Sequence, residues 1–160
     1  MVRPATGWRE RVELERRLVH ASGTAYPVPY LLDWISWVET AALLVASVVV
    51  VVILEFLRLV VGLDHPVYRA LTREYETDAV GGYALYQVGM AGTALLATTA
   101  VTTPTLAVPA MWMLSVGDPV SGALSDNGPR EPKRPRVWVA MFAVCVAVAL
   151  PFVVPAFGQT

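Results

Sequence analysis

The chain has 160 residues, of which 56% are hydrophobic and 16% are charged, and its mean hydropathy is +0.54. Because about 25% of the residues in a soluble domain are charged, this composition argues against an ordinary soluble protein. The formal net charge of −1 gives no reason to expect a nucleic-acid partner. The single cysteine, Cys145, excludes an internal disulfide and a thiolate metal cluster, and we interpret it as a packing residue.

The charged residues are concentrated in a few short segments. All twelve Lys and Arg residues fall within residues 1–20, 58–78 and 124–136, whereas 79–117 and 137–160 contain no Asp, Glu, Lys, Arg or His. A transmembrane helix needs roughly 20 apolar residues, so the first uncharged stretch fits two spans and the second fits one. The pattern predicts an integral membrane protein in which the residues able to do chemistry share one face.

Taken in chain order, the elements form a single all-α membrane domain over residues 1–160. Residues 1–20 predict an amphipathic N-terminus with a helix over 8–19. Gly23, Pro27 and Pro29 interrupt the apolar stretch that follows, so a helix there should be tilted or broken. The next span should end near Glu55 and Arg58, residues 65–78 should form a loop or surface helix, and the fourth span should end at 117–119. The predicted membrane segments are 21–35, 40–57, 82–98, 104–117 and 137–157.

The topology depends on the short segment 21–34. If this segment crosses the membrane, all three basic segments lie on the same side; if it does not, the N-terminus lies opposite the other two. Because cytoplasmic loops carry the excess of Lys and Arg, crossing is favoured. We therefore expect a multi-pass protein of the cell membrane with five spans and a cytoplasmic N-terminus.

Two polar motifs precede the middle of the chain. Arg16, Arg17 and His20 place two guanidinium groups and an imidazole within about one helical turn, and arginine forks bind phosphate. The alternative is a basic cluster that meets lipid headgroups. Glu55 and Arg58 have two interpretations. They form an ion pair at the end of a helix, or they lie within the membrane region, where ionisable residues are usually functional.

The third motif surrounds Asp118, the first carboxylate after the long uncharged stretch. Small residues beside it, from Gly117 to Ser121, would let a phosphate chain approach the backbone, and the carboxylate could hold Mg²⁺ against that chain. A polar turn that ends a helix is the alternative. Lys133, Arg134 and Arg136 follow in a proline-rich loop, where they either neutralise phosphates or orient the last span by their charge.

Together, Arg16-Arg17-x-x-His20, Glu55-x-x-Arg58 and Gly117-Asp118 with its basic loop resemble the dolichol kinase and phytol kinase family. These CTP-dependent lipid kinases are related to phosphatidate cytidylyltransferases. The resemblance covers most of the chain in the right order. It implies that Asp118 is a metal or phosphate ligand, that Lys133 is the basic residue of the downstream loop, and that the upstream polar residues belong to the same site.

The resemblance further implies CTP as co-substrate, Mg²⁺ or another divalent cation, and an isoprenoid alcohol as acceptor among the membrane lipids. His20 or Glu55 would assist deprotonation of that alcohol. Family members have a fuller glycine-rich nucleotide segment than Asn127-Gly128, and they continue through further helices beyond the position of Thr160. We therefore expect a shortened member, for which completion by a second copy is one alternative. A lipid cytidylyltransferase and a non-catalytic membrane scaffold of the same fold are the rival interpretations.

Overall fold

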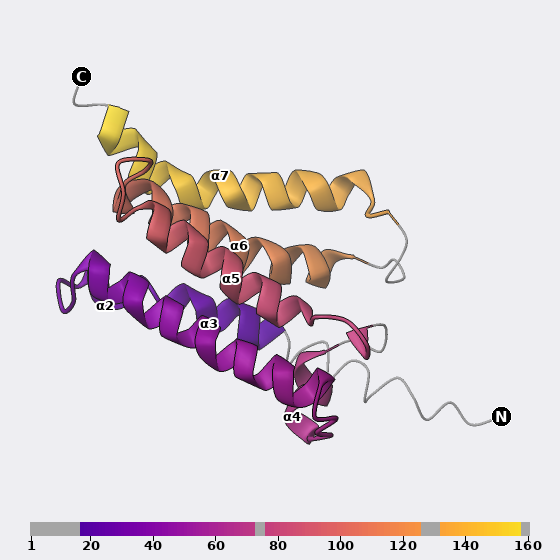
Figure 1. The fold of residues 1–160 in the computed structure, drawn as a ribbon. Coiled ribbons are helices and arrows are strands. Elements are labelled where there is room, and N and C mark those ends of the chain that lie inside the picture. Colours follow the sequence, from indigo (N-terminus) through magenta and orange to yellow (C-terminus); the bar gives the residue numbers. More distant parts are fainter. Residues whose placement is uncertain (1–16, 73–75, 126–131, 158–160) are drawn as a thin grey trace.

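The structure, a computed structural model, describes residues 17–72, 76–125 and 132–157 (Figure 1). Within these ranges the regular elements are all helical, as predicted. Residues 17–22 are helical, and the remaining elements are η1 (Gly23–Ala25), α2 (Val28–Leu31), α3 (Trp37–Leu59), α4 (Pro66–Leu71), α5 (Gly82–Leu96), α6 (Pro104–Leu124) and α7 (Pro135–Phe157).

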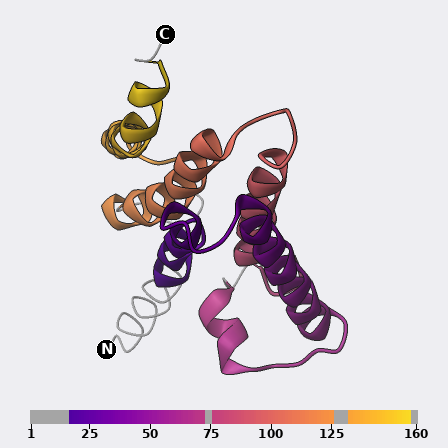
Figure 2. The same ribbon diagram turned by 90° about the vertical axis from the view of Figure 1, so that its left-hand side faces the viewer.

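The long helices pack as two pairs. Helix α3 lies against α5 and α6 lies against α7, while the contact between α5 and α6 is less extensive. Figure 2, which looks along the bundle, shows residues 17–31 between the two pairs. Hydrogen bonds fix this segment on both sides: Trp112 Nε1 donates to the carbonyl of Thr24, and Tyr26 Oη donates to Ser47 Oγ. The N-terminal segment therefore bridges the two pairs, in addition to the direct contact between α5 and α6.

The N-terminal segment is broken where the sequence predicts. Helix 17–22 gives way to the short η1 at Gly23, where an added Cβ would lie only 1.7 Å from Tyr86 Oη. Helix α2 then ends before Asp33, whose φ of 56° lies in the left-handed region that Asp tolerates better than most residues. Most of the predicted helix over 8–19 lies outside the described residues.

Helix α3 begins at Trp37, three residues before the predicted span, because Ser36 caps it. The backbone N–H of Glu39 donates to Ser36 Oγ, and the Glu39 carboxylate accepts from the Ser36 backbone N–H. This reciprocal arrangement satisfies two N–H groups that would otherwise lack a partner at the helix end. The segment 65–78, predicted to be a loop or a surface helix, contains the short helix α4 (Pro66–Leu71).

The helix end predicted at 117–119 was wrong. Helix α6 does not stop at 117–119 but continues through Pro119 to Leu124, so Asp118 lies within a helix rather than after one. A proline removes one backbone hydrogen bond without necessarily ending a helix, and membrane helices tolerate this where neighbouring groups satisfy the backbone.

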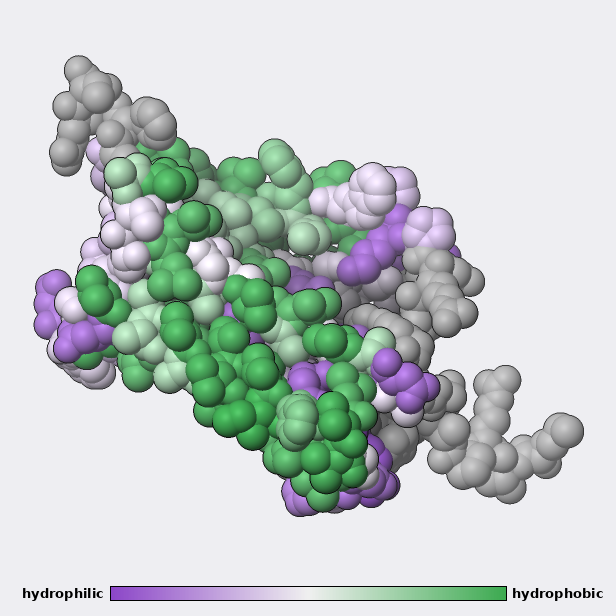
Figure 3. Space-filling model, in the orientation of Figure 1, coloured by the Kyte–Doolittle hydropathy of each residue, from purple (hydrophilic) through white to green (hydrophobic). Residues whose placement is uncertain are grey.

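The core lies at the end of the bundle away from the basic residues. Trp37 and Leu44 of α3 pack with Met90 and Ala94 of α5 and with Met111 of α6. Large hydrophobic side chains are nevertheless exposed along α3 and α7, and Figure 3 shows hydrophobic residues over the middle of the bundle and hydrophilic ones towards its ends. By length and composition, Trp37–Leu59 and Pro135–Pro155 are sufficiently apolar to cross a membrane.

Candidate functional site

A groove between α5 and α6 opens at the basic end of the bundle. We call it the α5–α6 groove; its volume is about 450 Å³, and it is lined by His20, Glu76, Gly82, Leu85, Tyr86, Gly89, Leu114 and Asp118. Three of these residues, His20, Glu76 and Tyr86, are buried and form its floor. The rim is exposed and combines Asp118 with the apolar positions Leu85, Gly89 and Leu114. The groove therefore has a polar part and an apolar part.

His20 and Asp118 face each other in this groove, although they are almost a hundred residues apart in the chain. Their closest atoms, His20 Nε2 and Asp118 Oδ2, are 4.0 Å apart. The His20 side chain is 9% exposed and the Asp118 side chain is 51% exposed. This arrangement leaves the carboxylate accessible to a ligand while the imidazole is held inside the bundle.

Tyr86 holds the His20 segment in place. Its hydroxyl donates to the backbone carbonyl of His20 at 3.0 Å and lies 2.6 Å from Ser115 Oγ. The Tyr86 and His20 rings are also in contact, with their centroids 4.4 Å apart. Tyr86, itself held by Ser115 of α6, thus fixes the His20 segment opposite Asp118.

Two cations lie at the C-terminal end of α6, close to the groove. Arg17 Nη2 donates to the carbonyl of Gly122 at 2.9 Å, and Lys133 Nζ donates to Ser121 Oγ. Glycine at 122 suits this approach, since an added Cβ would lie 3.2 Å from Arg17 Nε. Cations at a helix C-terminus also stabilise its dipole, so both residues have a structural role whether or not they bind phosphate.

Two other predicted phosphate-binding residues that the structure describes, Arg134 and Gly117, do not line the groove. Arg16 lies outside the described residues, and Arg134 is exposed in the loop before α7. Gly117 faces away from the groove and towards α7, where an added Cβ would lie 3.6 Å from Cys145 Sγ. Gly117 therefore serves the packing of α6 on α7.

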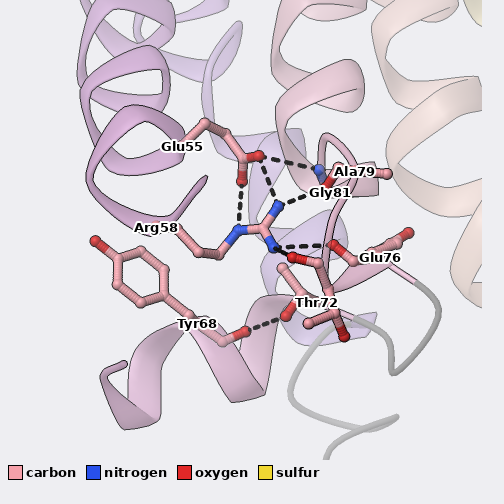
Figure 4. Close-up of polar contacts among 8 residues, drawn as sticks. Glu55, Arg58, Tyr68, Thr72, Glu76, Ala79 and Gly81 are labelled. Carbon is pink, nitrogen blue, oxygen red and sulfur yellow. Dashed lines mark hydrogen bonds and ion pairs between the residues drawn. The ribbon is translucent and has the colours of Figure 1, made fainter. Parts of the chain in front are cut away.

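Glu55 and Arg58 form a separate polar cluster that links α3 to the segment before α5 (Figure 4). Arg58 Nη2 and Nε donate to the Glu55 carboxylate at 2.7 and 3.2 Å, and this carboxylate accepts a third hydrogen bond from the backbone N–H of Gly81. Arg58 also donates to the backbone carbonyls of Glu76, Thr77 and Ala79. Neither side chain lines the α5–α6 groove.

Glu76 is a groove residue that sequence reasoning missed. It is only 9% exposed, and a Cβ added at Gly82 would lie 3.3 Å from Glu76 Oε1, so the carboxylate sits over the start of α5. In the sequence it is one of several acidic residues in the polar segment 64–78. Nothing local distinguishes it from Asp64, Glu74 or Asp78; only the three-dimensional contacts do.

The described residues contain no group of three or more His, Cys, Asp and Glu side chains that could hold a metal ion by themselves. Mg²⁺, however, is usually bound by one or two carboxylates together with water and substrate phosphates. The exposed carboxylate of Asp118 fits a cation that arrives with a nucleotide. A metal cage built entirely from this part of the chain does not fit.

Comparisons with protein-family models, with curated proteins and with solved structures found no match.

Proposed function

We propose that the protein is a dolichol-kinase-like enzyme that transfers the γ-phosphoryl group of CTP to an isoprenoid alcohol at the cytoplasmic face of the cell membrane. The observation that carries this proposal is the α5–α6 groove, in which His20 and Asp118 stand 4.0 Å apart at the edge of apolar surface. A hydroxyl on an apolar chain and a phosphate-bound cation are the two partners that such a site suits.

In this proposal His20 takes the proton of the alcohol, whose oxygen then bonds to the γ-phosphorus as the bond to the β-phosphate oxygen breaks and CDP leaves. The groove favours His20 over Glu55 as the base, because His20 lines it and Glu55 is already held by Arg58 and Gly81. A base must come within hydrogen-bond reach of the proton it removes.

Asp118 would hold Mg²⁺ carried by the nucleotide, and that ion would neutralise charge on the transferring phosphoryl group. Arg17, Lys133 and Arg134 would neutralise the remaining phosphate charge from the C-terminal end of α6. Phosphoryl transfer depends on positioning and electrostatic stabilisation more than on covalent participation by the protein. The clustered cations and the accessible carboxylate are suited to those tasks.

The proposal places five segments across the membrane, with the N-terminus and the groove in contact with the cytoplasm. Single cysteines at Ser36 and Thr77, both exposed, test it in a Cys145→Ala background. A membrane-impermeant thiol reagent should modify position 77 only from the cytoplasmic side and position 36 only from the outside. Modification of position 36 from the cytoplasm would rule out crossing by 21–34.

The activity itself is tested with purified protein, CTP labelled on its γ-phosphoryl group, and a panel of isoprenoid alcohols. Label should appear in a lipid phosphate in the presence of Mg²⁺, and Asp118→Asn should abolish it. Absence of labelled lipid with every alcohol and with both CTP and ATP would contradict the proposal and favour a non-catalytic scaffold.

One observation supports a second candidate, a lipid cytidylyltransferase. Such an enzyme needs a second carboxylate near Asp118, and Glu76 lines the same groove. The two reactions differ in the fate of the nucleotide. A cytidylyltransferase would place label from the α-phosphoryl group in the lipid and release pyrophosphate, whereas the kinase would transfer only the γ-label.

A further inference from the structure

The α5–α6 groove changes character along its length. Its polar groups are Glu76, which lies at the start of α5 beside Gly82, and His20 and Asp118, which lie beside Tyr86 one turn further on. Further along α5 the wall consists of Leu85 and Gly89, and Leu114 faces them from α6. Positions 82, 85, 86 and 89 recur at helical spacing, so they form one face of α5.

The apolar part of the groove opens sideways rather than into the bundle. Its rim residues Leu85 and Leu114 are 64% and 39% exposed, and Gly89 between them is also exposed. Beyond this point the two helices close on each other through Ala91 and Ala94 of α5 and Met111 of α6, which belong to the core. A chain longer than the groove therefore has to leave laterally, over the exposed apolar surface that includes Val88.

We propose that the α5–α6 groove is a lateral binding site for a lipid with one hydrocarbon chain and a hydroxyl head. The head lies at His20 and Asp118, and the chain leaves between Leu85 and Leu114. Gly89 lies at the narrow end of the passage: a Cβ added there would already be in van der Waals contact with Leu114 Cδ2 at 3.8 Å, so the chain leaves on the exposed side of this pair. The identity of the head group rests on the proposed function, whereas the location and width of the passage rest on the groove alone.

The helix supplies its own control for this inference. An added Cβ at Gly92 would meet no atom within 4 Å, and Gly92 does not line the groove. Gly89→Phe should therefore obstruct the passage, whereas Gly92→Phe adds the same bulk about one turn away without obstructing it. Both changes replace a glycine within α5, so their effects on helix propensity should match.

The test uses the full chain in vesicles that contain a diazirine-bearing farnesol, without nucleotide. Illumination should attach the probe to peptides that contain Leu85, Gly89 or Leu114. Gly89→Phe should reduce this labelling by about tenfold or more, because the ring fills space that the chain needs, whereas Gly92→Phe should leave it unchanged. A diazirine-bearing phosphatidylcholine, which has two chains, should not label these peptides above the level of other lipid-facing segments.

Equal labelling of the two variants, or equal labelling by the two lipids, would overturn the inference. If Gly89→Phe does not fold, Gly89→Cys in a Cys145→Ala background gives a second measurement. Farnesol should slow alkylation of the introduced thiol at position 89 and not at position 92; equal rates at both positions would also overturn it.

Because no nucleotide is present, the labelling result is independent of catalysis. Groove labelling without any lipid phosphorylation would leave the lipid site standing and contradict the proposed function. Lipid phosphorylation that Gly89→Phe and Gly92→Phe reduce equally would support the proposed function and contradict the lipid site at Gly89.

Discussion

The two acidic sites at the basic end of the bundle show how differently a carboxylate can be used in one molecule. Glu55 is buried, ion-paired with Arg58 and bonded to the backbone N–H of Gly81. Asp118 is half exposed, and His20 Nε2 lies 4.0 Å from its carboxylate. The Glu55 carboxylate has its hydrogen-bonding capacity taken up by the protein, whereas the Asp118 carboxylate has room for an external partner.

The partners of a carboxylate, rather than its burial alone, therefore separate the two sites. A buried carboxylate is costly unless it is paired and hydrogen-bonded. Around Glu55 that requirement is met by the Arg58 fork, which also binds three backbone carbonyls of the segment before α5. We infer that the Glu55–Arg58 cluster stabilises the contact between α3 and the segment before α5, and we propose the α5–α6 groove as the place of phosphoryl transfer.

Arg58→Ala should have the largest effect on stability, because it leaves Glu55 buried without its ion partner. Breaking a buried pair from one side costs roughly 3–5 kcal/mol. Arg69→Ala is the matched control: its pair with Asp64 is 3.3 Å long but exposed on both sides, and it should cost at most about 1 kcal/mol. Chemical unfolding in detergent would compare the two variants. Equal losses in the free energy of unfolding would contradict a structural role for Arg58.

Gly23→Ala should lower the free energy of unfolding by about 1–3 kcal/mol, because it overpacks a well-packed site beside the groove. The new methyl group would lie 1.7 Å from Tyr86 Oη. Tyr86→Phe removes that oxygen, so the double variant should lose less stability than the two single losses added together. Strict additivity in thermal unfolding would show that Gly23 and Tyr86 do not constrain each other.

Neutralising Lys133 and Arg134 together, by Lys133→Gln/Arg134→Gln, should raise the KM for CTP about tenfold, the value of one lost charge-assisted hydrogen bond. If these residues instead act only as a charge signal, CTP binding should stay unchanged and the C-terminus should appear on both sides of the membrane in part of the population. Arg69→Gln, which removes another cation from the basic end, should alter neither property.

Ser36→Ala should have the smallest effect, a loss of about 1 kcal/mol, because it removes the cap of α3 at the end of the bundle away from the groove. Thermal unfolding should detect the loss, while lipid phosphorylation below the melting transition should be unchanged. A change in the KM for CTP would show that the two ends of the bundle are coupled.

Much of the fold could be predicted because its signals are local. The uncharged stretches located α5, α7 and the start of α6 to within a few residues, and the glycine and prolines after His20 predicted the break in the N-terminal segment. The end of α6 could not be read from Pro119, because whether a proline ends a helix depends on what packs around it. The start of α3 depended on a reciprocal cap between Ser36 and Glu39.

The site was predictable in part for the same reason. His20 and Asp118 stood out as polar residues beside apolar stretches, and the structure brings them together. Glu76 did not stand out, because its role depends on contacts with the start of α5. Glu55 could be read either as half of an ion pair or as a functional acid, and its contacts with Arg58 and the backbone N–H of Gly81 distinguish it from an open acid.

If Asp118 serves the reaction and Glu55 serves the fold, a paired measurement on Asp118→Asn and Glu55→Gln will separate the two roles. Both variants replace a carboxylate by its amide, and each is assayed for thermal unfolding and for CTP-dependent lipid phosphorylation at a temperature where the protein is folded. Asp118→Asn should keep the melting temperature and lose activity by about a hundredfold or more; Glu55→Gln should melt earlier and keep most of its activity. The reverse pattern, with an active Asp118→Asn protein and a stable but inactive Glu55→Gln protein, would contradict the account.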